Sequence, residues 1–446
     1  MSPQDAAAEA LAELLPTLPG LRDCPELQAL LEDAAGSRWP ARSKGPHGSP
    51  APATQPADQR LREFFRRHPA LGKRDRQQIG DWIFDVLRNL RLYASAAVAA
   101  GAGGAAQAPP RPPAGDPVRE LIRIARAAAE QPAGVCGSPA AALGQNDYPE
   151  AVRYSLPDWL WVRLQAGYGA RAGPIAQALL RPAPIELRVN LLRGKAEVLQ
   201  QRLADAGIVA VRIDQVPTGL RVSGRPSLEK LDLFERGWFE MQEAGSQGIA
   251  DFCDARRGQL VVDFCAGAGG KTLAMGAAMR NTGKVLAFDT GEERLSRLMP
   301  RARRAGLDIV QTLRITGLSD LRLARYRRRA DVVLVDAPCS GTGTIRRSPD
   351  LKWRLSRERL LEHVQEQQAI LAAASALVRP GGKLVYATCS LLPEENEQQV
   401  DRFREPGFAL AQIAHWLPGE GSASGFFAAK WVFRGPQPPP PIQYSK

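Results

Sequence analysis

Continuous apolar runs alternate with amphipathic stretches in the second half of the chain. From about residue 246 onward, four apolar runs read LVVDFCAG, VLAFDT, DVVLVDAP and KLVYATCS, and each ends in small or polar residues. Strands that are apolar throughout are typical of parallel sheets covered by helices on both faces. The pattern predicts a doubly wound α/β domain over residues 246–435, with ligands beyond the carboxyl ends of its strands.

The first half of the chain shows two other patterns. IELRVNLLRGKAEVLQQRLADAGIVAVRI follows the order strand, loop, helix, strand and predicts a small α/β module over residues 150–245. LREFFRRHPALGKRDRQQIGDWIFDVLRNLRLY has apolar residues at helical spacing and predicts a helical domain within residues 1–140. Stretches rich in Pro, Gly and Ala predict flexible insertions over residues 36–58 and 98–116, and a disordered tail over 436–446.

Length and charge agree with several domains and a polyanionic partner. A chain of 446 residues exceeds the size of one usual core. Its formal net charge of +12 suits binding to RNA, although a genome that favours Arg, Ala, Gly and Pro codons would give the same balance. The N-terminus lacks the basic start and apolar run of a signal peptide, and no apolar stretch could span a membrane. We therefore expect a soluble, cytoplasmic protein without a membrane partner, and a monomer by default.

The cysteines and histidines do not have the spacing of a metal site. Six cysteines occur without a C-x-x-C pair, and four histidines occur without an i, i+4 pair. We therefore expect free thiols, no disulfide framework and no metal.

A glycine-rich turn follows the first of the four strands. The sequence VVDFCAGAGGKT places glycines where a ligand can approach the backbone, and the next strand ends in Asp289, whose carboxylate can accept hydrogen bonds from ribose hydroxyls. A nicotinamide enzyme normally has G-x-G-x-x-G, and a P-loop would have glycine in place of Cys265. The turn therefore favours S-adenosylmethionine. Its predicted cofactor residues are Cys265, Ala266, Gly267, Ala268, Gly269, Gly270 and Lys271.

Two further strands are each followed by a thiol. Cys339 lies in DAPCSG after the strand DVVLV, and Cys389 lies in ATCS after KLVY. A single cysteine at a strand end is more often a small buried apolar residue. Two of them at the same sheet edge as a nucleotide-type turn favour covalent chemistry, because carbon 5 of cytosine becomes nucleophilic only after something adds to carbon 6, and a thiolate is well suited to reversible addition.

The motifs DFCAGAGGKT, DAPCSGTGTIRRSPDLKWR and VYATCSLLPEENE resemble those of the Nop/Sun family of RNA cytosine-5 methyltransferases, and of its RsmB-type members in particular. The resemblance covers roughly residues 150–435, and GKRDR with VLRNLR resembles the NusB-like helical domain of those enzymes. It implies an α/β fold with a Rossmann-like S-adenosylmethionine methyltransferase sheet, a small α/β module and an N-terminal helical domain. It also implies methylation of carbon 5 of a cytosine in RNA, with 16S ribosomal RNA favoured and transfer RNA as an alternative.

The resemblance assigns roles to the two thiols and two charged residues. It implies that Cys389 attacks carbon 6 of the base and that Cys339 helps eliminate the enzyme from the product. Asp336 would hydrogen-bond the pyrimidine edge and border the cofactor. Lys271 would lie between cofactor and base, where a cation can orient substrate or favour a thiolate.

The cofactor residues that the resemblance implies include Arg294 and Thr316. Family members usually have an acid in the loop where this chain has Thr316. A hydroxyl binds the adenine amine only weakly, and Asp320 stands further along the chain, so we expect a lower cofactor affinity than in relatives.

A basic rim is predicted next to the thiols. Residues 297–329 contain ten arginines and two aspartates. Four basic residues predicted to bind RNA follow the Cys339 motif: Arg346, Arg347, Lys352 and Arg354. The target cytosine must leave any base stack to reach a thiol.

Two other functions remain open at this point. One is a non-catalytic RNA-binding assembly factor that keeps the fold and the basic surface. The other is an enzyme of a different kind on the same type of sheet, either a methyltransferase with a protein or small-molecule substrate or a dehydrogenase. Paired thiols are not needed for either of these reactions.

Overall fold

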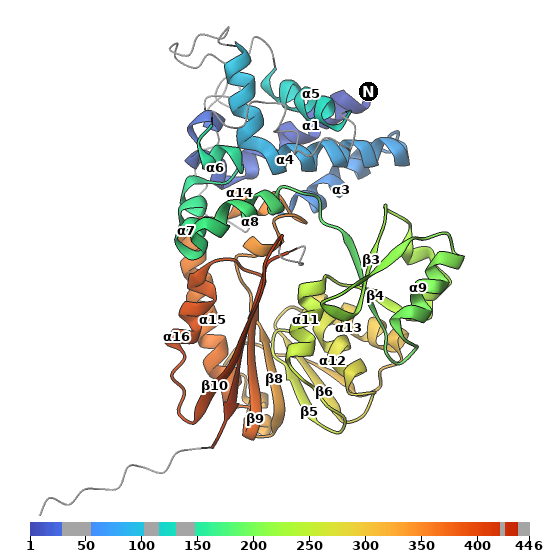
Figure 1. Ribbon diagram of the computed structural model, residues 1–446, viewed down its shortest axis with the longest axis vertical. Helices are drawn as coiled ribbons and strands as arrows, with labels where there is room; N and C mark the ends of the chain where they lie inside the picture. Colours follow the sequence, from blue (N-terminus) through green and yellow to red (C-terminus); the bar gives the residue numbers. More distant parts are fainter. Residues whose placement is uncertain (29–54, 102–115, 131–147, 420–423, 436–446) are drawn as a thin grey trace, which may run out of the picture. The chain divides into compact units, whose positions relative to one another are not determined.

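The computed structural model (Figure 1) describes most of the chain, and its residues divide into two compact units. The described residues are 1–28, 55–101, 116–130, 148–419 and 424–435. Unit 1 comprises residues 1–182 and 344–359, and unit 2 comprises residues 183–343 and 360–446.

The predicted insertions fall largely outside the described residues, and the predicted disordered tail over 436–446 falls wholly outside them. The ends of the insertions are nevertheless helical. Helix α3 begins at Ala57, and α4 continues to Gly101, beyond the point where the Pro/Gly-rich composition begins.

Unit 1 is helical in its described residues, as the apolar spacing predicts. Its α-helices are α1 (Pro3–Leu14), α3 (Ala57–Arg67), α4 (Lys73–Gly101), α5 (Pro117–Ala129), α6 (Glu150–Arg153), α7 (Asp158–Tyr168), α8 (Ala172–Leu179) and α14 (Leu351–Arg354). Its 3-10 turns include η1 (Leu15–Thr17), η2 (Pro19–Asp23) and η5 (Gly169–Arg171). Local sequence explains where α5 begins, because the Asp116 carboxylate accepts hydrogen bonds from two backbone N–H groups of the first turn and proline follows it.

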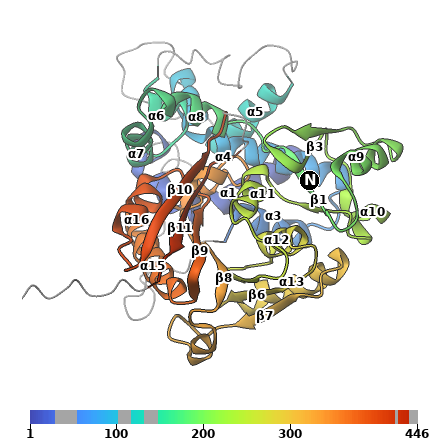
Figure 2. The same ribbon diagram turned by 60° about the horizontal axis from the view of Figure 1, so that its bottom comes forward.

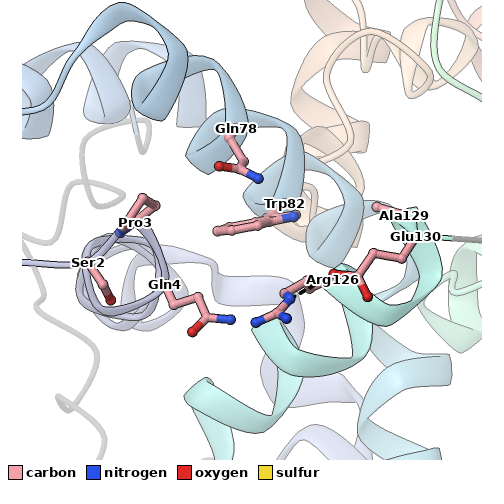
Figure 3. A pocket seen from close by; sticks show the side chains of 8 residues that line it. All are labelled: Ser2, Pro3, Gln4, Gln78, Trp82, Arg126, Ala129 and Glu130. Atoms are coloured by element: carbon pink, nitrogen blue, oxygen red, sulfur yellow. Dashed lines mark hydrogen bonds and ion pairs between the residues drawn. The ribbon is translucent and has the colours of Figure 1, made fainter.

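A pocket of about 480 Å³ opens between α1, α4 and α5 (Figure 3). Trp82 forms part of its wall, and an ion pair of 2.9 Å joins Arg126 to Glu130 beside it. Its lining residues are Ser2, Pro3, Gln4, Gln78, Trp82, Arg126, Ala129 and Glu130, none of which was predicted to belong to a site.

Helices α6 to α8 group with unit 1, whereas the small α/β module was predicted to begin at residue 150, and the bounds of that module stay a prediction. The buried guanidinium of Arg91, on α4, donates to the Leu156 carbonyl and pairs with Asp158, both at 2.6 Å. The backbone N–H of Arg91 also donates to Ser155 Oγ at 3.0 Å. These contacts tie the segment that precedes α7 to the helical core.

The segment 344–359, which follows the Cys339 motif, also packs in unit 1. Trp353 is fully buried in the helical core, and its Nε1–H donates to the Leu87 carbonyl at 2.7 Å. Asp350 Oδ2 accepts a hydrogen bond from the Ala57 backbone N–H at 3.1 Å, at the first residue of α3. The chain therefore leaves unit 2 after Gly343, completes the core of unit 1, and returns at Leu360.

The first sheet of unit 2 has four antiparallel strands in the order β2-β3-β1-β4. Its strands are β1 (Ile185–Val189), β2 (Ala210–Ile213), β3 (Val216–Val222) and β4 (Phe239–Met241). The helical segments of this region are α9 (Ala196–Asp205), η6 (Leu228–Lys230), α10 (Asp232–Glu235) and α11 (Ala244–Phe252). Leu199 and Leu203 of α9 pack with Leu187 and Leu220 in one apolar core.

The second sheet has seven strands in the order β10-β11-β9-β8-β5-β6-β7. Its strands are β5 (Leu260–Asp263), β6 (Lys284–Asp289), β7 (Val310–Arg314), β8 (Ala330–Asp336), β9 (Val378–Thr388), β10 (Phe408–Trp416) and β11 (Phe426–Phe433). The five strands from β5 to β9 pair in parallel, whereas β10 and β11 are antiparallel. The four predicted apolar strands are thus confirmed as β5, β6, β8 and β9.

Helices cover both faces of this sheet (Figure 2). Alternate residues of β5 show why: Val261 shares a core with Met275 of α12, whereas Val262 shares one with Leu371 of α15. The helical segments around the sheet are α12 (Gly270–Ala278), α13 (Glu292–Ala305), η7 (Leu321–Tyr326), η8 (Thr342–Thr344), α15 (Arg357–Ser375), η9 (Pro393–Glu395) and α16 (Glu397–Arg402). Within the described parts of the chain, no helix has both the length and the apolar character needed to cross a bilayer.

Replacing Trp353 should destabilise unit 1. Trp353→Ala removes a fully buried indole and leaves the Leu87 carbonyl without its donor, so we expect a loss of about 3–5 kcal/mol in the free energy of unfolding of unit 1. Hydrogen–deuterium exchange of the α4 amides measures this loss. Val162→Ala, at a side chain that is 60% exposed on α7, is the control and should change the stability by less than about 0.5 kcal/mol. Equal effects of the two substitutions would contradict the packing described here.

Candidate active site

The turn between β5 and α12 depends on glycine. Gly267 and Gly269 have φ angles of +54° and +85°, in the left-handed region that glycine adopts without strain. A Cβ on Gly269 would also lie 2.4 Å from Leu298 Cγ. Gly270 begins α12, so the N–H groups of its first turn face the space beyond β5.

Asp289, at the end of β6, holds the turn from the neighbouring strand. Its Oδ2 accepts a hydrogen bond from the Gly267 N–H at 2.8 Å, and its Oδ1 accepts from Gly291 N–H and Arg294 Nη2, each at 2.7 Å. The structure therefore brings together three of the residues predicted to bind the cofactor.

Two arginines hold the turn from the other side. Arg301 Nη1 donates to the Ala268 carbonyl at 2.6 Å, and Arg188 Nη1 donates to the Gly270 carbonyl at 2.7 Å. Glu240 pairs with Arg301 at 2.9 Å and with Arg304 at 2.5 Å. Arg188 is buried, and this lowers its pKa to about 10. Sequence reasoning gave no role to Arg188 or Glu240, because their partners are far away in the chain.

Asp263 is a second residue that sequence reasoning missed. It ends β5 and is buried, and its Oδ2 accepts a hydrogen bond from Thr272 Oγ1 at 2.6 Å. Burial raises the pKa of Asp263 to about 7, and within the described part of the chain its Oδ1 has no hydrogen-bond partner. The available signal was its position, as the last strand residue before the glycine turn.

The loop after β7 contains an acid near the position of Thr316. The Asp320 carboxylate accepts hydrogen bonds from the Thr316 N–H at 3.0 Å and the Thr316 hydroxyl at 3.3 Å. Arg322 pairs with it at 2.6 Å and, as the largest influence, lowers the pKa of Asp320. The loop turns back on itself and brings Asp320 next to Thr316, while the expected contact of this loop with the adenine stays a prediction.

The two predicted thiols lie next to each other. The Sγ atoms of Cys339 and Cys389 are 3.4 Å apart, and both side chains are half-buried. The loops that carry them are joined by a hydrogen bond of 2.9 Å from the Gly343 N–H to the Cys389 carbonyl. The hydrogen bond with Cys389, with further contributions from burial and from Glu395, raises the pKa of the Cys339 thiol.

A half-buried ion pair lies beside these thiols. Lys271 Nζ is 2.6 Å from Asp336 Oδ2. Burial would lower the pKa of Lys271, but the carboxylate of Asp336 outweighs this effect, and together with Cys389 it raises the pKa. The four predicted catalytic residues, Cys389, Cys339, Asp336 and Lys271, therefore form one cluster.

Comparison with known proteins adds to this geometry. A family model described as "16S rRNA methyltransferase RsmB/F" matches residues 251–431, and one for the ferredoxin-like domain of RsmF/B-like methyltransferases matches residues 156–229. Ribosomal RNA small subunit methyltransferase B of Citrobacter koseri is 36% identical over 293 residues, which are 63% of this chain and 67% of that protein. The chain belongs to the RsmB/F methyltransferase family.

Further relatives agree with this membership. The corresponding protein of Sodalis glossinidius is 34% identical, and the match covers 63% of this chain and 66% of that protein. The crystal structure of PH0851 superposes with a TM-score of 0.67 at 26% identity, covering 84% of this chain and 94% of that one. A methyltransferase homolog from Pyrococcus horikoshii gives 0.56 at 28% identity, covering 64% of this chain and 97% of that one.

Part of the predicted basic rim of this RsmB/F methyltransferase is held by contacts within the protein. Arg301 and Arg304 pair with the buried Glu240. The arginines of 327–329 precede β8, at the opposite edge of the sheet from Asp336, which ends that strand. The expectation that the arginines of 297–329 gather as one rim beside the thiols is therefore wrong.

The four basic residues predicted to bind RNA differ in their surroundings. Lys352 is fully buried in unit 1, and its Nζ donates to the Arg88 carbonyl at 2.7 Å. The prediction that Lys352 contacts RNA is therefore wrong: the helix period places it on the inner face of α14. Arg346 donates to the Pro182 carbonyl at 2.8 Å, and Arg354 pairs with Asp350 at 2.8 Å. Arg347 is exposed, and its contact with RNA stays a prediction.

Alkylation should report the environment of Cys339. In a Cys389→Ser variant, burial and Glu395 still disfavour the Cys339 thiolate. We expect the rate at which iodoacetamide modifies Cys339, followed by peptide mass spectrometry, to reach half its maximum above pH 9, compared with about 8.5 for an ordinary thiol. A midpoint at or below 8.5 would show that the surroundings of Cys339 do not suppress its ionisation.

Lys352→Met tests whether this lysine is structural. Burial lowers the pKa of Lys352 well below its usual range, so replacing the amine by an apolar side chain should leave unit 1 as stable or more stable. The salt dependence of RNA binding should not change, whereas Arg347→Ala should reduce the slope of log K against log salt by about 1. Filter binding over a range of salt concentrations measures both. The burial argument does not survive if Lys352→Met lowers the slope as much as Arg347→Ala.

Proposed function

We propose that this chain uses S-adenosylmethionine to methylate carbon 5 of a cytosine in ribosomal RNA through a covalent adduct with Cys389. The observation that carries this proposal is the pair of thiols, 3.4 Å apart, beyond adjacent parallel strands. A methyltransferase for oxygen or nitrogen atoms has no use for two thiols at this point. Carbon 5 of cytosine needs one, because the base must be activated at carbon 6.

The residues around the glycine turn suit S-adenosylmethionine. The left-handed glycines and the N–H groups at the start of α12 suit close approach of the ligand, and Asp289 can accept hydrogen bonds from the ribose. The unpartnered Oδ1 of Asp263 suits the ammonium of the methionine portion. Asp320 and Thr316 together offer acceptors for the adenine amine. The bound cofactor would supply an electrophilic methyl group on its sulfonium.

The cluster can carry out the remaining steps. The Cys389 thiolate adds to carbon 6 and opens the 5,6 double bond, while Asp336, beside Lys271, stabilises a proton at N3. Carbon 5 would then take the methyl group, and the electron pair of the broken carbon–sulfur bond would stay on the sulfur of the cofactor. Loss of the proton from carbon 5 re-forms the double bond as the Cys389–carbon 6 bond breaks with its electron pair going to Cys389 Sγ, and the proton at N3 returns to Asp336. The Sγ of Cys339, next to that of Cys389, lies where it can take this proton.

Electrostatics favour this division of labour. Cys389 is the thiol that interacts with the Lys271 cation, whereas Cys339 is the thiol that interacts with the Glu395 carboxylate. A cation favours a thiolate and an anion disfavours one. We therefore assign the nucleophilic role to Cys389, and Cys339, whose thiolate is the disfavoured one, is once ionised the stronger base that removal of the carbon 5 proton requires.

The substrate is proposed from the relatives and the charge. The names of the curated relatives specify small-subunit ribosomal RNA, and a net charge of +12 suits an RNA substrate. We propose 16S ribosomal RNA in the cytoplasm, with transfer RNA as the alternative outcome of the test. The cluster of Cys389, Cys339, Asp336 and Lys271 is complete, which argues against a non-catalytic assembly factor.

Methyl transfer from labelled S-adenosylmethionine tests this proposal. The substrate is total RNA from a strain that lacks the gene, and the enzymes are wild type, Cys389→Ala and Cys339→Ala. We expect 5-methylcytosine in 16S RNA with wild type and a loss of at least about 10³-fold with Cys389→Ala, because the covalent route is closed. With Cys339→Ala we expect an RNA adduct that survives denaturing electrophoresis.

Other outcomes have distinct meanings. Label in transfer RNA would identify transfer RNA as the substrate and leave the proposed reaction unchanged. Label at a position other than carbon 5, or full activity of Cys389→Ala, would overturn the proposed mechanism. RNA binding by wild type without any transfer would favour the assembly-factor function.

A further inference from the structure

A carboxylate lies buried next to the loop of Cys339. Glu395, at the end of η9, is fully buried. Its Oε1 accepts a hydrogen bond from the Ser340 N–H at 2.8 Å, and its Oε2 contacts the Ser340 hydroxyl. Gln367 of α15 donates to Oε1 at 3.0 Å and to the Pro338 carbonyl at 2.9 Å. The residues on both sides of Cys339 are therefore held by Glu395, directly or through one amide.

The same cluster extends to the loop of Cys389. The hydroxyls of Ser340 and Ser390 are 3.1 Å apart, and Thr342 Oγ1 lies 3.2 Å from Ser390 Oγ. Thr342 Oγ1 also accepts a hydrogen bond from the Leu391 N–H at 2.9 Å. A continuous set of hydrogen bonds thus runs from Glu395 through Ser340, next to Cys339, to Ser390, next to Cys389.

Burial of this carboxylate is unfavourable in free energy. Among the residues that the structure describes, the groups that donate to it are a backbone amide, a side-chain amide and the hydroxyls of Ser340 and Ser390, all of them neutral. Burial raises the pKa of Glu395 accordingly. An apolar residue of similar volume would avoid that cost. The carboxylate offers a geometric advantage in return, because its two oxygens can fix both the N–H and the hydroxyl of Ser340.

We propose that Glu395 is a positioning residue, which through Ser340 holds the loop of Cys339 at the distance from Cys389 that the two-thiol reaction needs. The inference rests on the proposed function, because it gives the two thiols successive steps on one base. Glu395 acts through Ser340, and the residues that touch the reacting atoms remain those of the cluster. Misplacement of a reacting group by about 1 Å can cost about 10²-fold in rate.

The experiment compares Glu395→Ala, Glu395→Gln and a control, Glu397→Gln, two positions away. Alanine removes both acceptors. Glutamine keeps an acceptor for the Ser340 N–H, and its amide can donate to the Ser340 hydroxyl, so it should preserve the position of the loop. Glu397 is 44% exposed and pairs with His415 at 2.7 Å, outside the thiol cluster.

Two measurements report position separately. Turnover on RNA should fall by about 10²-fold in Glu395→Ala, with KM for S-adenosylmethionine within about twofold of wild type, and the RNA adduct should persist on a denaturing gel. Phenylarsine oxide, which condenses with two neighbouring thiols and releases water, should bridge Cys339 and Cys389 in wild type and at least about tenfold more slowly in Glu395→Ala. Glu395→Gln should recover both properties to within about threefold of wild type, and Glu397→Gln should match wild type.

The reaction of phenylarsine oxide with the two thiols does not require RNA. Failure of the proposed function can therefore be told apart from failure of the positioning role. If wild type makes no 5-methylcytosine but Glu395→Ala still loses the bridge and glutamine restores it, the proposed function fails and the positioning role stands. If wild type makes 5-methylcytosine and Glu395→Ala retains its turnover and its bridge, the positioning role is overturned. It is also overturned if Glu395→Ala loses thermal stability and glutamine restores the stability but neither the turnover nor the bridge.

Discussion

Strands β5, β6, β8 and β9 pair in parallel. Their carboxyl ends must therefore all lie at the same edge of the sheet. This constraint gathers Asp263, Asp289 and Asp336, each the last residue of its strand, from a span of more than seventy residues. The thiols follow at the same edge: Asp336 pairs in register with Ala387, so the loops that begin after these residues start side by side. The glycine turn, the Lys271–Asp336 ion pair and the two thiols lie at one edge of the sheet because of this register.

The hydrophobic pattern predicts this arrangement well. A parallel strand that is covered on both faces is apolar along its whole length, and this can be seen in the local sequence. The runs around Val262, Leu286 and Val333 are apolar at every position, since both faces of the sheet are covered. Residues placed at strand ends could therefore be predicted to meet. The turn between β5 and α12 was also predictable, because its glycines satisfy a local backbone requirement at Gly267 and Gly269.

The residues that could not be predicted have partners far away in the chain. Nothing in RRSPDLKWR indicates that Trp353 completes a core made by residues more than two hundred positions earlier, or that Lys352 is buried beside it. Glu395 stands in an acidic run that has the composition of a solvated helix end. Arg301 is one of many arginines in its stretch, and only tertiary structure shows that it binds a carbonyl of the glycine turn. For such residues the local sequence shows only that the side chain is polar. Whether the side chain is buried depends on tertiary packing.

Several buried or half-buried charged groups lie around the edge where the strands end, and they differ in whether an opposite charge is near. Lys271 and Asp336 neutralise each other, whereas Asp263 and Glu395 are buried carboxylates with no cation within hydrogen-bonding distance among the described residues. The pKa of Asp263 is raised to about 7 from 3.8, so the stability that this group gives the folded state is full below pH 3.8 and is lost as the pH rises to about 7. A cationic ligand beside its free oxygen would reverse that loss. Glu395 differs, because it is fully buried and both its oxygens accept hydrogen bonds from the protein, so that its contribution is to geometry within the protein.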